Sequence, residues 1–226
     1  MKFIHTSDWH LGAAFSVLPP ALASKRREEH HRAISEIIDC AITSKVDLFL
    51  IAGDLFNSQN PSTGDIAFVQ NLLTKLKNEK IAVFIIPGNH ETNSQMNSLK
   101  EKFVHNIHQK SFNLGSILFI GCGGSTFTPF NTPFEMSEKE FEKAISKLKT
   151  QDHRLKILLL THEPPYGTKL DYLGEHEGSK SIRKFIDKHQ PDYNICGHFH
   201  ENEGLKDKIG RTIVINPGPK GKIIEL

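Results

Sequence analysis

The chain has 226 residues, 38% of them apolar, and a formal net charge of +2 at pH 7. This length suits one well-buried domain and is too short for two large ones, so we expect residues 1–226 to form a single domain without a separate capping domain. The near-neutral charge neither requires nor excludes a polyanionic partner.

A membrane partner is not expected, because no apolar run approaches the roughly 20 residues that span a bilayer. The three cysteines form no CxxC pair, which is typical of proteins from a reducing compartment. We therefore expect a soluble, cytoplasmic protein.

Apolar runs alternate with segments of helical periodicity in the first half of the chain. Strands are predicted at residues 3–7, 47–52 and 82–86. Helices are predicted at about residues 24–44, after the Pro19-Pro20 break, and 65–78. This alternation indicates parallel strands joined by right-handed crossovers. Because the strands are almost continuously apolar, we expect the sheet to be covered on both faces.

The second half repeats this order less regularly. Strands are predicted at residues 117–122 and 156–160. Ser137 and Glu140 form a capping box that begins one helix, and another helix is predicted at residues 179–188. Three short strands near 205–209, 211–215 and 223–226 are expected to form an antiparallel meander in a second sheet.

Five of the apolar runs end next to side chains that can bind a metal. In open α/β sheets, the carboxyl ends of the strands form the usual site for ligands. The candidates, in chain order, are Asp8, His10, Asp54, Asn89, His162, His198 and His200.

These residue types suit a pair of divalent metal ions. Two metals about 3.5–4 Å apart can generate hydroxide at neutral pH and stabilise the attacking and leaving oxygens of a phosphoryl displacement. A mixture of nitrogen and oxygen ligands suits manganese, iron or zinc and disfavours magnesium or calcium. Glycines precede Asp54, Asn89 and His198, and we expect them to permit the sharp turns that direct these side chains over the sheet edge.

The motifs D-x-H, G-D, G-N-H-E, a lone His and G-H-x-H, in this order, resemble those of the calcineurin-like metallophosphoesterases. The resemblance implies a four-layer α/β/β/α sandwich of two mixed β-sheets flanked by helices. It implies one metal bound by Asp8, His10, Asp54 and His200, and a second bound by Asp54, Asn89, His162 and His198, with Asp54 bridging the two. By the same resemblance, His90 protonates the leaving oxygen and is assisted by Glu91.

The substrate is less well determined. The segments HTSDWHLG, AGDLF and PGNHE are similar to SbcD-type DNA repair exonucleases, which implies hydrolysis of DNA phosphodiesters by a metal-bridging hydroxide, with manganese. Many of those nucleases have His or Asp where this chain has Asn57, which is a candidate substrate-binding residue. The second half is more similar to small stand-alone phosphoesterases. Two alternatives therefore stay open: a phosphatase or cyclic-nucleotide phosphodiesterase for small molecules, and a non-catalytic scaffold with the same fold.

Overall fold

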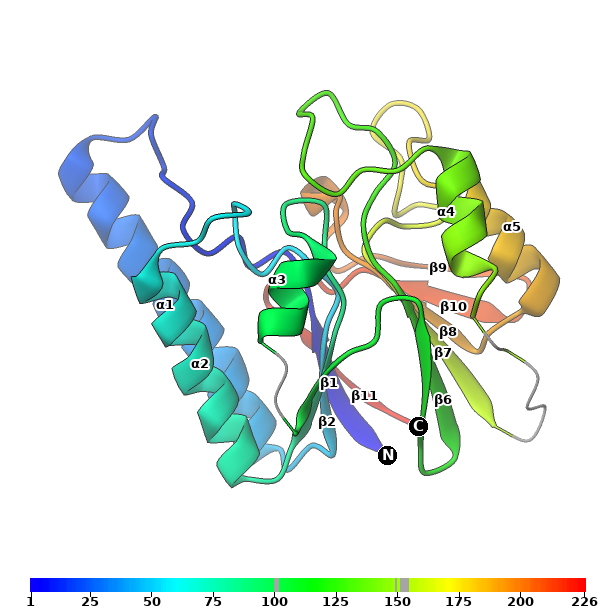
Figure 1. Ribbon diagram of the computed structural model, residues 1–226, viewed down its shortest axis with the longest axis horizontal. Helices are drawn as coiled ribbons and strands as arrows, with labels where there is room; N and C mark the ends of the chain where they lie inside the picture. Colours follow the sequence, from blue (N-terminus) through cyan, green and yellow to red (C-terminus); the bar gives the residue numbers. More distant parts are fainter. Residues whose placement is uncertain (100–101, 149, 151–154) are drawn as a thin grey trace.

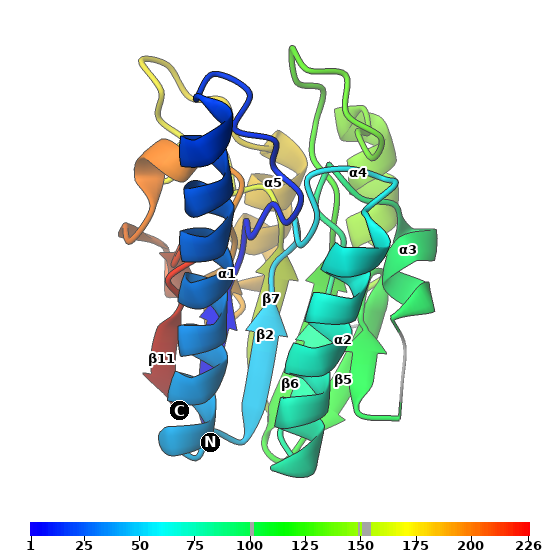
Figure 2. The same ribbon diagram turned by 90° about the vertical axis from the view of Figure 1, so that its left-hand side faces the viewer.

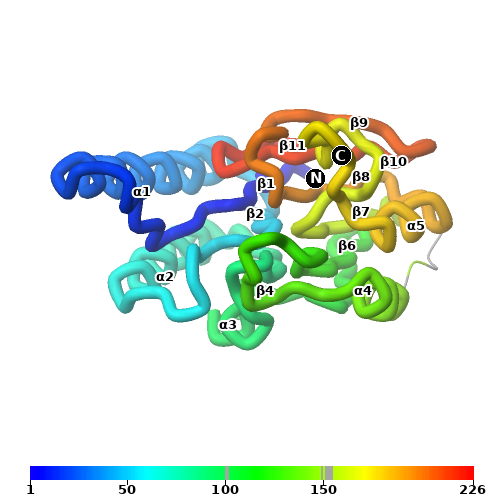
Figure 3. The backbone as a smooth tube through the Cα atoms, turned by 90° about the horizontal axis from the view of Figure 1, so that it is seen from above, coloured from blue at the N-terminus to red at the C-terminus, as the bar shows by residue number. Residues whose placement is uncertain are grey.

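Two β-sheets stack face to face, with helices on both outer surfaces, so the protein has four layers (Figure 1). The computed structural model describes residues 1–99, 102–148, 150 and 155–226. In the view from above, α1 and α2 lie on one side of the sheets and α4 and α5 on the other (Figure 3). The predicted α/β/β/α sandwich is confirmed.

The first sheet has the strand order β11-β1-β2-β3-β4. Its strands β1 to β4 run parallel, and β11 pairs with β1 in the antiparallel direction. The strands of this sheet are β1 (Lys2–Thr6), β2 (Leu48–Ile51), β3 (Ala82–Ile85), β4 (Val104–Asn106) and β11 (Lys222–Glu225). The helices beside it are α1 (Pro20–Thr43), α2 (Thr63–Asn78) and α3 (Asn93–Ser98).

The second sheet has the order β5-β6-β7-β8-β10-β9, with a parallel centre and an antiparallel strand at each edge. Its strands are β5 (Lys110–Leu114), β6 (Ile117–Cys122), β7 (Lys156–Thr161), β8 (Tyr193–Ile195), β9 (Lys206–Ile209) and β10 (Thr212–Ile215). The helices that cover it are α4 (Glu138–Ile145) and α5 (Lys180–His189), and a short 3-10 turn, η1 (His200–Asn202), follows β8.

Aromatic side chains fill the layer between the two sheets. The ring of Phe119 in β6 packs edge-on against Phe3 and Phe84 of the first sheet, at centroid distances of 6.4 and 5.1 Å. All three side chains are at most 1% exposed. Separate apolar layers lie under α1 and α2 and under α4 and α5. The central strands are therefore buried on both faces, as their apolar runs predicted.

Two sequence-based predictions about the elements are wrong in detail. Helix α1 begins at Pro20 rather than near Ser24, because a proline at the first helical position loses no hydrogen bond. The last three strands form no meander. Strands β9 and β10 pair as a hairpin in the second sheet, whereas β11 crosses to the first sheet and pairs with β1. Two prolines, Pro217 and Pro219, separate β10 from β11 and disfavour a hairpin between them.

The parallel strands bring their carboxyl ends to one edge of the molecule, which lies at the top of Figure 2. The loops after β1, β2, β3, β7 and β8 therefore meet there. None of the helices formed by the described residues combines the length and apolarity needed to cross a bilayer.

Replacing Phe119 with alanine should lower the free energy of unfolding by about 3–5 kcal/mol, because the cavity would lie between the two sheets. Urea denaturation measures this change. Val17→Ala is the control: this side chain is 93% exposed, and the free energy should stay within about 0.5 kcal/mol. Equal stabilities of the two variants would contradict the packing of Phe119 between the sheets.

Candidate metal centre

The seven predicted ligands lie together at the carboxyl edge of the strands. Both sheets contribute, because three of the supporting strands belong to the first sheet and two to the second. Asp8 and His10 follow β1, Asp54 follows β2, Asn89 follows β3, His162 follows β7, and His198 and His200 follow β8.

Three of these side chains form one compact group of donor atoms. His162 Nε2 lies 2.9 Å from Asn89 Oδ1, and His198 Nδ1 lies 3.2 Å from each of these two atoms. The Nδ1 atom of His162 donates to the carbonyl oxygen of Ala52 at 2.8 Å, which directs Nε2 toward the group.

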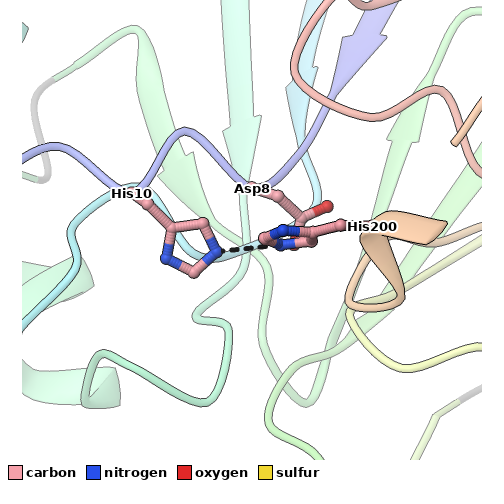
Figure 4. Close-up of side chains that lie close together, drawn as sticks. All are labelled: Asp8, His10 and His200. Carbon is pink, nitrogen blue, oxygen red and sulfur yellow. Dashed lines mark hydrogen bonds and ion pairs between the residues drawn. The ribbon is translucent and has the colours of Figure 1, made fainter. Parts of the chain in front are cut away.

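A second group forms around His10 and His200, whose Nε2 atoms are 3.1 Å apart. The two rings point toward one another, and Asp8 lies beside His200 (Figure 4). The distance from His200 Nε2 to Asp8 Oδ1 is 3.8 Å.

The carboxylate of Asp54 lies between the two groups. Its Oδ2 atom is 3.3 Å from His162 Nε2 and 3.5 Å from His10 Nε2. Its Oδ1 atom accepts the backbone N–H of His90 at 3.0 Å. One oxygen is thus held by the backbone, while the other faces both groups of nitrogen donors.

These distances suit two metal ions. Two ligands at right angles, each about 2.1 Å from a shared cation, are about 3.0 Å apart. The separations between the donor atoms around His162 match that value, and the His10–His200 pair does as well. Imidazole nitrogens at this distance are hard to explain without a proton or a cation between them.

The electrostatics of the centre also favour a cation. Burial lowers the pKa of His162, but the Asp54 carboxylate outweighs burial and raises the pKa to about 10. Burial and the neighbouring His162 lower the pKa of His198 to about 3. The Asp54 carboxylate thus attracts positive charge to the buried imidazole beside it, a place that a divalent ion can take.

Several ligands have strained backbone conformations. Asp8, His10, Asp54 and His198 have φ values of 58°, 43°, 52° and 73°, in the left-handed region that non-glycine residues rarely adopt. Such strain collects at functional sites, where the surrounding structure enforces it. The sequence-based prediction assigns the turns to the preceding glycines, but only Gly53 of the three has a positive φ, of 92°.

Gly88 and Gly197 have a different role: each allows a carboxylate to lie very close to the backbone. A Cβ atom on Gly88 would overlap the Asp54 carboxylate, and one on Gly197 would overlap the Asp8 carboxylate. The absence of a side chain at these positions therefore lets the buried carboxylates lie directly against the backbone.

His90 lies next to the ligands and is partly exposed. Its ring packs edge-on against His10 at 4.9 Å, and its Nδ1 donates to the carbonyl oxygen of Asn57 at 3.3 Å. His90 and Asn57 both line a cleft of about 770 Å³ beside the centre. His90, His10 and Asp54 could also hold an ion together.

Glu91 is fully buried and binds the backbone. Its two oxygens accept the N–H groups of Asp54, Phe56 and Gly88 at 2.8 to 3.1 Å. Burial and the Asp54 carboxylate raise its pKa to about 8, which these amides only partly offset. Glu91 thus joins the loop after β2 to the loop after β3, and its carboxylate oxygens are occupied by backbone donors.

Sequence reasoning missed the loop of residues 124–136, which lies against Asn89. The Nδ2 atom of Asn89 donates to Thr132 Oγ1 at 2.9 Å, which turns Oδ1 toward the histidines, and the carbonyl of Asn89 accepts the Phe134 N–H at 3.0 Å. It also missed Glu163, a buried residue whose oxygens accept from the backbone and the hydroxyl of Thr126. Glu163 directly follows the candidate ligand His162 in the sequence, and this is the signal that could have found it.

The chain belongs to the calcineurin-like phosphoesterase family, whose model matches residues 1–202. It is therefore a metal-dependent phosphoesterase of a family that uses two metals. Over 99% of its length it is 40% identical to an uncharacterized protein, MJ1162, of Methanocaldococcus jannaschii, of which it covers 91%.

Other relatives match less than half of the chain. The DNA double-strand break repair protein Mre11 of Methanosarcina acetivorans is 36% identical over 92 residues, which are 41% of this chain and 14% of that protein. SbcD, a component of the SbcCD nuclease of Escherichia coli, is 29% identical over 102 residues, 45% of this chain and 24% of that protein.

Solved structures agree on the fold. A dimetal phosphatase from Danio rerio superposes with a TM-score of 0.62 at 11% identity, over 96% of this chain and 86% of that one. TT1561 of Thermus thermophilus superposes with a TM-score of 0.65 at 14% identity, over 97% and 89%. At these identities, the likeness supports the four-layer fold alone.

Replacing Gly88 with alanine should lower manganese affinity about 10- to 100-fold, because the new Cβ would displace the Asp54 carboxylate. Isothermal titration calorimetry with manganese measures this affinity. Gly64→Ala is the matched control, since the nearest atom to its Cβ would be Ser62 Oγ at 3.6 Å. An unchanged affinity in Gly88→Ala would mean that the carboxylate position does not matter for binding.

Glu91→Gln should lower the unfolding free energy of the metal-free protein by about 1–3 kcal/mol, because an amide NH₂ would face buried backbone donors. Chemical denaturation in the presence of a chelator measures this effect. Glu225→Gln is the control, because that side chain is 74% exposed. Full stability of Glu91→Gln together with a reduced kcat would instead favour direct assistance to His90.

Proposed function

We propose that the protein hydrolyses phosphodiester bonds at a centre of two divalent metal ions. Asp8, His10, Asp54 and His200 would hold one ion, and Asp54, Asn89, His162 and His198 the other. The observation that carries this proposal is the position of Asp54 Oδ2, within 3.5 Å of a histidine nitrogen from each group. Manganese is the proposed metal, with iron or zinc as alternatives, because nitrogen and oxygen donors are mixed.

Bound metals would supply a nucleophile from water at neutral pH and neutralise charge on the phosphoryl oxygens. The protein itself supplies the orientation of the ligands. Asp54 is fixed by the N–H of His90, and Asp8 accepts the N–H of His198 at 3.0 Å. Because backbone groups hold both carboxylates, the centre is organised before substrate arrives.

His90 is the proposed general acid. A carbonyl oxygen only accepts hydrogen bonds, so Nδ1 of His90 carries a proton toward Asn57, and Nε2 stays available for proton transfer. The residue also borders the clefts on both sides of the centre, where a leaving group would lie. Asn57 positions His90 through its backbone, and we propose that its side chain contacts substrate in the same cleft.

Nuclease activity is a second candidate, favoured by the similarity to Mre11 and SbcD over 41% and 45% of this chain. We further propose that residues 1–226 act as one domain, because both sheets provide ligands to one centre. A cytoplasmic location is supported by three free cysteines.

His90→Ala should lower kcat for bis(p-nitrophenyl) phosphate by about 10²- to 10⁴-fold, the usual contribution of a general acid, while two metals stay bound. Steady-state kinetics and metal analysis of the dialysed protein give both quantities. Asp54→Ala should lose metal as well as turnover. His189→Ala, a histidine on α5, is the control and should keep both, whereas full turnover by His90→Ala would exclude the acid role.

A further inference from the structure

Two large aromatic side chains are exposed on the loop of residues 124–136. Phe127 is 71% exposed and Phe130 is 79% exposed. Exposed phenylalanines cost solubility, so two of them beside a functional centre require an explanation.

The loop that carries them is held by many hydrogen bonds. Glu135 Oε1 accepts from the hydroxyls of Thr128 and Thr132 and from the Thr132 N–H, at 2.6 to 2.7 Å. The Thr128 hydroxyl also accepts the N–H of Phe130 at 3.2 Å. Since Thr132 is bonded to Asn89 as well, these bonds connect the backbone of Phe130 to a proposed metal ligand.

Phe130 lines two neighbouring clefts beside the candidate metal centre. One cleft, of about 770 Å³, also contains His10, His90 and His200. The other, of about 580 Å³, contains these three histidines and Phe127. A group bonded to a phosphate at the metals would therefore have the ring of Phe130 within its reach.

The charge of the second cleft limits what that group can be. The exposed side chains of Glu177 and Glu201 line it, and no lysine or arginine does so among the described residues. Nucleic-acid backbones are bound through lysine and arginine contacts to successive phosphates. A second phosphate in this cleft would meet carboxylates instead.

We infer that Phe130 is a specificity-determining residue that stacks on an uncharged aromatic group carried by the substrate phosphate, such as a nucleobase or an aryl ring. In the second cleft, Glu177 and Glu201 disfavour substrates in which that group carries a further phosphate, whereas the first cleft contains both Arg26 and Glu29. The inference rests on the proposed function, because it places the phosphate at the two metals. It names the substrate class as phosphoesters with a terminal aromatic group.

Binding to the manganese-loaded protein tests the inference without turnover. Isothermal titration calorimetry compares methyl phosphate, phenyl phosphate and thymidine 5′-monophosphate. Base-to-ring stacking predicts that at least one aromatic ligand binds about 5- to 150-fold more tightly than methyl phosphate. Phe130→Ala should abolish that advantage and leave the affinity for methyl phosphate and manganese unchanged, whereas Phe130→Trp should retain it.

The two aromatic ligands distinguish the two kinds of substrate. Weaker binding of phenyl phosphate to Phe130→Ala would indicate an aryl ester, and weaker binding of thymidine 5′-monophosphate would indicate a nucleoside. Thymidine 3′,5′-bisphosphate should bind more weakly than the monophosphate, and Glu177→Gln with Glu201→Gln should reduce the difference. Tyr172→Ala is the control, because Tyr172 is 53% exposed but lines neither cleft beside the metals.

Equal affinity of wild type and Phe130→Ala for both aromatic ligands would overturn the inference, as would tighter binding of the bisphosphate. Failure of the proposed function would look different. The protein would then bind these ligands but release no product from any phosphodiester.

Discussion

The structure depends on keeping two carboxylates, Asp8 and Asp54, almost completely out of water. A buried carboxylate is costly unless hydrogen bonds and opposite charge compensate it. Here backbone N–H groups meet both side chains, and histidines from distant parts of the chain complete the surroundings. The positive φ values, the glycines pressed against the carboxylates and the buried Glu91 all serve this arrangement.

The same constraint explains why two sheets are needed. The first sheet supplies both carboxylates, whereas His162 and His198 come from the second. The Asp54 carboxylate lies within 3.5 Å of one imidazole from each sheet, His10 from the first and His162 from the second. The aromatic layer around Phe119 sets the distance between the sheets, and it thereby sets the separation of the two ligand groups as well. The packing between the sheets therefore controls how far apart the two groups of candidate ligands lie.

Much of this could be predicted from the sequence, because strand periodicity and strand-end ligands are local signals. The motifs led to the layer order and to seven candidate ligands, whose side chains lie together in the structure. Contacts between residues far apart in the chain could not be predicted from the sequence. The pairing of β11 with β1 depends on a partner at the opposite end of the chain, and the prolines before β11 only exclude the alternative. The role of Gly88 depends on an atom of Asp54 across the site, which no turn rule reveals. The motif alone suggests Glu91 as a partner of His90, although its contacts are with backbone amides.

The connection between Asn89 and the loop of residues 124–136 has a consequence for how this protein can change. Thr132 and Phe134 anchor the loop to Asn89, a proposed metal ligand, so substitutions or insertions there are expected to disturb metal binding together with the inferred substrate preference. The tip between Thr128 and Asn131 carries Phe130 and makes no such bond to Asn89. New specificities can therefore arise by replacing the tip residues, while the anchors preserve the chemistry. Selection can therefore act on metal binding and on substrate preference separately, although the residues for both lie in the loop of residues 124–136.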